Sequence, residues 1–111
     1  MECNEFCDKV LALLEDGLYR ACGLSLPYLA ESLGCRCGNA GEVFEDITGI
    51  PFEDVLAAFR IREVCSLVRD KGVRLVDAWK FSGFRSFREY RSVYGRFLGK
   101  YADCAGLWEC G

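Results

Sequence analysis

The sequence PFEDVLAAFRIREVCSLVRDKG, residues 51–72, determines how the rest of the chain is organised. Pro51 is typical of the first turn of a helix, and Gly72 is typical of the position just after one. Between them, apolar residues recur at the three- and four-residue spacing of a buried helix face: Phe52, Val55, Leu56, Phe59, Val64, Leu67 and Val68. We therefore expect one long helix across this stretch.

Shorter helical segments flank the long helix on both sides. We expect them over residues 4–19, 23–34, 37–48, 73–83 and 86–98, with a further turn or two in 102–109. Ser25 and Ser86 suit helix starts, and three glycines suit helix ends: Gly34, Gly49 and Gly83. No stretch alternates apolar and polar residues as a strand does. The predicted fold class is all-α.

The flanking helices form two pairs. Residues 5–50 and 73–103 each contain a short helix, a tight turn near a glycine and a second helix, which is the layout of a helix-turn-helix unit. The chain has 111 residues, the length of one domain. We predict a single all-α domain, residues 1–111, in which two helix-turn-helix units are joined by a long central helix at 51–72.

Composition places the chain among globular proteins. Hydrophobic residues make up 51% and charged residues 28%, a balance that excludes a disordered chain. No apolar run approaches the roughly 20 residues that cross a bilayer, and the opening MECNEFCDKV lacks the basic-then-apolar layout of a signal peptide. We expect a cytoplasmic protein without a membrane partner.

Charge is distributed unevenly along the chain, whose formal net charge is −3. Up to Val55 there are eleven acidic and three basic residues, a formal charge of −8. From Leu56 onward there are eleven basic and six acidic residues, a formal charge of +5. This asymmetry suggests that the C-terminal half faces a polyanion and the N-terminal half faces something else.

Three sets of residues mark the two helix pairs and the helix between them. Phe44 is followed five positions later by Gly49. In the long helix, Arg60 and Ile61 are followed by Val64. The second pair carries a glycine–aromatic turn, two further aromatic residues and a closing glycine: Gly83, Phe84, Tyr90, Tyr94 and Gly99. In order and spacing these residues resemble the DNA-binding domain of the AraC/XylS family of bacterial transcription regulators.

The resemblance implies an all-α regulator that binds double-stranded DNA in the major groove with the second helix of each pair. In the second pair it places Arg88, Arg91 and Ser92 at groove-facing positions. Arginine can donate two hydrogen bonds to guanine O6 and N7. The residues expected at the DNA interface are Arg85, Ser86, Arg88, Arg91, Ser92, Arg96 and Lys100, with the outer cations on phosphates. Phe87 is interpreted as a core residue rather than a contact to a thymine methyl group.

The first pair has the opposite chemistry. The resemblance places Gly38, Gly41 and Glu42 toward the groove, and the two glycines offer no side chain to a base. Glu42, Glu45 and Asp46 form one negative face at helical spacing, which a phosphate backbone would repel. Asn39 is interpreted as a local helix cap. We therefore expect the second pair to read DNA, and the acidic face to meet a protein partner that carries basic groups.

Eight cysteines and the absence of histidine define the remaining chemistry. The first interpretation is that the thiols are reduced and mostly buried, with Cys22 and Cys65 as small core residues. A thiol or soft-metal site at Cys35, Cys37 and a third cysteine is an alternative, since Arg36 can lower the pKa of a neighbouring thiol. Disulfides are the third. Apart from this alternative, the sequence predicts no metal site, and it predicts no cofactor.

Catalysis is not expected from this sequence. It contains no phosphate-binding glycine loop and no nucleophile-elbow serine. The main hypothesis is a sequence-specific DNA-binding regulator that reads DNA with its second helix pair. The alternatives are a degenerate relative that acts as a protein-interaction module, and a regulator that responds to thiol chemistry or to a soft metal.

Overall fold

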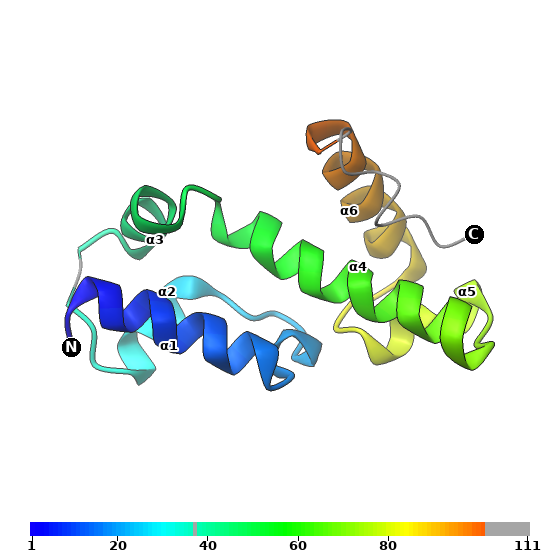
Figure 1. Cartoon of the computed structure of the whole chain (residues 1–111), viewed down its shortest axis with the longest axis horizontal. Coiled ribbons are helices and arrows are strands. Elements are labelled where there is room, and N and C mark those ends of the chain that lie inside the picture. The colour runs from blue at the N-terminus through cyan, green and yellow to red at the C-terminus, as the bar shows by residue number, and fades with distance from the viewer. Residues whose placement is uncertain (37, 102–111) are drawn as a thin grey trace. The chain divides into compact units, whose positions relative to one another are not determined.

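The computed structural model describes residues 1–36 and 38–101. In this part of the chain every regular element is helical, which confirms the predicted all-α class (Figure 1). The elements in chain order are α1 (Cys3–Glu15), the 3₁₀ helix η1 (Leu18–Arg20), α2 (Leu26–Ser32), α3 (Ala40–Thr48), α4 (Phe52–Lys71), α5 (Leu75–Ala78), the 3₁₀ helix η2 (Trp79–Phe81) and α6 (Phe87–Lys100).

The chain divides into two compact units, Met1–Leu56 and Ala57–Gly111. We call them the N-terminal unit and the C-terminal unit. The division falls inside α4, whose first residues belong to the N-terminal unit and whose remainder belongs to the C-terminal unit. Each unit therefore buries its own set of apolar side chains against a different part of the same helix.

The long helix α4 begins and ends where the sequence predicts. The carbonyl oxygen of Pro51 accepts hydrogen bonds from the backbone N–H groups of Asp54 and Val55, at 3.0 and 3.2 Å. These bonds satisfy donors that the first turn of a helix would otherwise leave without partners. At the other end, Gly72 adopts a positive φ of 67° and stops the helix.

In the N-terminal unit, α3 packs against both α1 and α2. The buried side of α1 carries Phe6, Val10 and Leu14 at four-residue intervals, as one face of a helix requires. Phe44 of α3 is fully buried, and its ring meets that of Phe52 edge to face with centroids 5.6 Å apart. This aromatic pair connects α3 to the first turn of α4.

Two predicted helix bounds in this unit are wrong. The first helix stops at Glu15 instead of reaching residue 19, because Gly17 takes a left-handed φ of 110° and a short 3₁₀ turn follows. A side chain is strained at this positive φ, so the turn favours glycine. The third helix begins at Ala40 rather than at residue 37.

In the C-terminal unit, α4, α5 and α6 share one core. Its fully covered members are Ala57, Ile61, Val64, Cys65, Ala78, Phe84, Tyr90 and Phe97. The hydroxyl of Ser82, which is fully buried beside this core, donates a hydrogen bond to the carbonyl oxygen of Ala78 at 3.1 Å. Burial therefore leaves that polar group satisfied, which avoids the cost of an unpaired hydroxyl.

Removal of the Phe44 ring should destabilise the N-terminal unit strongly. We expect Phe44→Ala to lower the free energy of unfolding by about 3–5 kcal/mol, because the lost side chain leaves a cavity in a closed core. Urea denaturation followed by circular dichroism measures the change. Ile47→Ala on the same helix is the control, since Ile47 is 42% exposed and should cost less than about 1 kcal/mol. Equal effects of the two substitutions would contradict the packing described for α3.

Candidate nucleic-acid interface

Two hydrogen bonds fix the start of α6. The hydroxyl oxygen of Ser86 accepts from the backbone N–H of Glu89 at 3.0 Å, which confirms the predicted cap. The Glu89 carboxylate accepts from the backbone N–H of Arg85, also at 3.0 Å. Together they resemble a capping box, although the carboxylate bonds the N–H one residue before the cap. They hold the chain entering α6 in one conformation.

The inner side of α6 is a row of aromatic rings. Phe87, Tyr90, Tyr94, Phe97 and Tyr101 alternate at intervals of three and four residues, so they share one face. The rings of Tyr90 and Tyr94 stack with centroids 5.6 Å apart, and Phe97 and Tyr101 lie 4.8 Å apart. All five belong to the core of the C-terminal unit or pack against it. This row determines which way the opposite face of α6 points.

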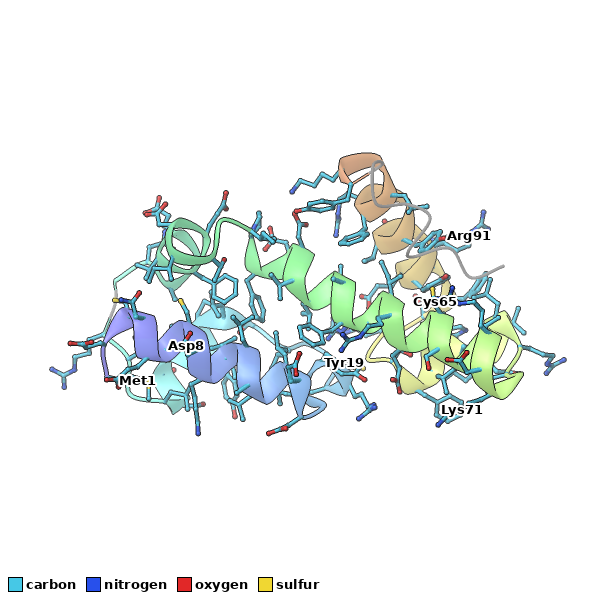
Figure 2. The ribbon with its side chains drawn as sticks, in the orientation of Figure 1. Met1, Asp8, Tyr19, Cys65, Lys71 and Arg91 are labelled. Atoms are coloured by element: carbon cyan, nitrogen blue, oxygen red, sulfur yellow. The ribbon has the colours of Figure 1, made fainter. Side chains whose placement is uncertain are left out.

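Five of the predicted interface residues lie on α6 outside this aromatic row, and Arg85 and Ser86 lie just before the helix. All seven are exposed: Arg85, Ser86, Arg88, Arg91, Ser92, Arg96 and Lys100. Figure 2 shows Arg91 extending outward from α6. Among the described residues, no carboxylate forms an ion pair with the guanidinium group of Arg85, Arg88, Arg91 or Arg96. The guanidinium groups of these four arginines are therefore available to an anion.

Arg88, Arg91 and Ser92 surround a hollow of about 440 Å³ on α6, together with Phe87. Phe87 is half-buried, and its ring lies 6.0 Å from that of Tyr90. It therefore packs against the core, as predicted, and it also lines the hollow.

The cations that precede α6 are differently placed. Asp77 accepts hydrogen bonds from Arg74 at 3.0 Å and from Lys80 at 3.3 Å. These two donors hold the pKa of Asp77 below its ordinary value. Arg74 and Lys80 therefore each form an ion pair with Asp77, whereas Arg88 and Arg91 form none among the described residues.

The first helix pair differs from the prediction at its start. Gly38 lies before the helix, in a left-handed conformation with φ of 64°, and is not a groove-facing helical residue. Asn39 caps α3, as predicted: its side-chain oxygen accepts from the backbone N–H of Glu42 at 3.2 Å. The N-cap residue precedes the first helical residue, so a cap at Asn39 makes Ala40 the start of α3. Gly41, Glu42, Glu45 and Asp46 are exposed, as the acidic face requires.

The expected reduced and buried state of the cysteines is wrong at three positions. Cys3 and Cys65 are each disulfide-bonded, and Cys22 is exposed rather than buried. Cys65 does lie in the core, on α4 (Figure 2), so the apolar neighbours correctly indicated burial but not chemistry. Disulfides are rare in the cytosol, so these two bonded residues do not support the expected cytoplasmic location.

The remaining thiols divide between core and surface. Cys7 is buried on α1, and burial raises its pKa, with Asp8 and Cys35 adding to the effect. Cys35 is half-buried, whereas Cys37, its proposed partner in a thiol or metal site, lies outside the described residues, as does the turn expected in 102–109. In the portion that the structure describes, no three cysteine or acidic side chains come close enough to hold a metal ion.

Comparisons with known proteins give no family for this chain. Protein-family models, curated proteins and solved structures all contain no match to it. Within residues 1–36 and 38–101, no helix combines the length and the apolar character needed to cross a membrane. Functional inference therefore depends on the geometry and charge of the two units.

Glu89 is the residue of this region that the sequence interpretation missed. It is the single acidic residue of the stretch 81–102, among five basic residues. The pattern Ser86–Phe87–Arg88–Glu89 fits a serine followed three residues later by a glutamate, which is a sequence signature of a helix start. From that signature, Glu89 could have been predicted to take part in the hydrogen bonds at the start of α6.

Loss of the Ser86 hydroxyl should weaken α6. We expect Ser86→Ala to lower the free energy of unfolding by about 1 kcal/mol, because the N–H of Glu89 loses its acceptor. Urea denaturation of the whole chain measures this change. The matched control is Ser92→Ala, an exposed serine inside the same helix, for which we expect a change within about 0.5 kcal/mol. A larger effect at Ser92 than at Ser86 would refute the cap.

Tyr90 should make the C-terminal unit sensitive to alkali. Burial, with a smaller contribution from Tyr94, raises its pKa from 10.0 to about 12. A raised pKa means that the fold favours the neutral phenol, so its contribution to stability is complete below pH 10 and is lost as pH rises toward 12. Denaturation across this range should show that decline, and Tyr90→Phe should remove it. Tyr28→Phe, at a tyrosine that is 64% exposed, should leave the decline in place; if it removes the decline instead, Tyr90 is not the source.

Proposed function

We propose that this chain is a sequence-specific DNA-binding transcription regulator of the AraC/XylS type and that α6 reads the major groove. The observation that supports this most directly is the pair Arg88 and Arg91, exposed side by side at one hollow without a carboxylate partner in the described part of the chain. In this proposal α5 with η2 and α6 form the second helix-turn-helix unit, and α2 and α3 form the first.

The dimensions of α6 suit a DNA groove. At 1.5 Å per residue its 14 residues span about 21 Å, and the major groove, about 12 Å wide, admits a helix. Arg88 and Arg91 are one turn apart on the same face, so both reach base edges in this orientation. Ser92 adds a hydroxyl that can donate to or accept from a base.

The outer cations suit the phosphate backbone. Arg85 precedes the helix, and Arg96 and Lys100 lie five and nine residues beyond Arg91. Each contact that neutralises a phosphate releases condensed counterions, so these residues contribute affinity that does not depend on sequence. The only acid within α6, Glu89, is engaged by the backbone N–H of Arg85.

Replacement of Arg88 and Arg91 tests the proposal. We expect Arg88→Ala with Arg91→Ala to weaken the preferred duplex by about 1–3 kcal/mol for each arginine that contacts guanine. A duplex selected from a random pool at low salt provides the probe, and fluorescence anisotropy measures the affinity. The expected outcome is loss of preference over a scrambled duplex.

Arg62→Ala with Arg69→Ala is the matched control. Both are exposed arginines of α4 in the same unit, so the change of net charge is identical. We expect the control to weaken both duplexes equally and only slightly. If no duplex binds at low salt, or if both double variants behave alike, α6 is not a reader of DNA sequence.

A further inference from the structure

A cavity of about 510 Å³ lies within the N-terminal unit. It is bordered by the start of α2, one side of α3 and the start of α4, and no residue of α6 lines it. Its volume is within the range of about 300–1,000 Å³ found for small-molecule sites. The sequence analysis assigned Glu42 and Glu45 of its wall to a face for a protein partner, but it did not predict a cavity beside them.

The floor of the cavity is apolar. Leu26, Phe52 and Leu56 line it and are themselves buried, with exposed fractions of 4%, 7% and 7%. Pro27 and Pro51 add further apolar surface at the starts of α2 and α4. A ligand that fills this space therefore gains by burying an apolar body against it.

The mouth of the cavity is acidic. Glu42 and Glu45 of α3 and Glu53 of α4 line it and are exposed. No lysine or arginine is among the described residues around it. Carboxylates without a nearby base attract a cation and repel phosphate, so this mouth is unsuited to DNA or to an anionic ligand.

The helix starts around the cavity do not reverse this preference. Each helix N-terminus contributes about half a positive charge, so three starts are outweighed by three full carboxylates. Two of the starts are also capped from within the chain. The hydroxyl oxygen of Ser25 accepts from the N–H of Tyr28 at 3.4 Å, and Asn39 accepts from the N–H of Glu42 at 3.2 Å. The donors that would hold an anion are thus partly engaged.

We propose that this cavity binds a small organic cation in which an apolar body carries an ammonium or guanidinium group. The body lies on Leu26, Phe52 and Leu56, and the charged group meets the carboxylates of Glu42, Glu45 and Glu53. The inference goes beyond DNA binding and does not depend on it, since the cavity is contained in the N-terminal unit.

An NMR titration with two probes of the same shape tests the charge requirement. Phenethylammonium chloride carries the cation, and phenethyl alcohol replaces it with a neutral hydroxyl. We expect saturable shifts of the Gly41 and Glu53 amide signals with the ammonium, and an affinity about tenfold weaker for the alcohol. Added salt should weaken the ammonium probe and leave the alcohol unchanged.

Variants of the whole chain separate the two parts of the site. Combined replacement of Glu42, Glu45 and Glu53 by Gln should reduce the preference for the ammonium to less than about twofold. The matched control replaces Glu5, Glu15 and Glu31 by Gln: these are exposed acids of the same unit that do not line the cavity, and the preference should persist.

Gly41→Leu tests the space itself. A Cβ at Gly41 would meet one neighbouring atom within 4 Å, Oδ1 of Asn39 at 3.4 Å, which is ordinary contact. Because Gly41 lines the cavity, we expect the leucine side chain to fill part of it. We expect it to abolish the shifts caused by both probes while the remaining amide spectrum stays folded.

Three results would overturn the proposal. The first is equal affinity for the ammonium and the alcohol, which would make the cavity merely apolar. The second is a shift pattern that the three cavity substitutions leave unchanged, which would indicate unspecific attraction to acids. The third is a dimer in analytical ultracentrifugation whose formation shifts the same amide signals in the NMR spectrum. That result would assign the cavity to a second copy of the chain.

Discussion

Burial of the aromatic row of α6 against α4 is the constraint on which the exposed cationic face depends. Because Tyr90 and Phe97 are held in the core, the residues on the other side of the same helix have to face solvent. A helix turns by about 100° per residue, so a slip of one position in this packing would rotate Arg88 and Arg91 away from their present direction. The cap at Ser86 helps to hold this rotation of the helix, because it fixes the residue at which the helix begins.

The two units use charge in different ways, although both are small helical cores. In the C-terminal unit, Asp77 pairs with Arg74 and Lys80, whereas the arginines of α6 form no ion pair among the described residues. In the N-terminal unit, Glu42, Glu45 and other acids dominate the surface of α3 and of the cavity. The uneven charge along the sequence therefore corresponds to two surfaces of opposite charge, one in each unit.

Local signals in the sequence were sufficient for most of the fold. The long helix and the caps at Ser25, Asn39 and Ser86 follow from residue types that satisfy the open backbone groups of a helix end. The break at Gly17 was missed because a glycine inside an apolar repeat does not by itself reveal a left-handed φ. The chemistry of Cys65 was missed because disulfide pairing depends on which sulfurs meet in space. The cavity could not be predicted from the sequence either, because its walls come from three segments that meet only in the folded chain.

The outward face of α6 also has consequences for how such a protein can change over generations. Arg88, Arg91 and Ser92 are exposed and contribute no ring or aliphatic group to the core. Codon changes at these positions can alter the exposed chemistry of the helix while the fold keeps its stability, since exposed substitutions typically shift the free energy of unfolding by only about 0.5 kcal/mol. Surface chemistry and folding are thereby inherited as nearly independent traits, so duplicated copies can diverge on this face without an intermediate that fails to fold.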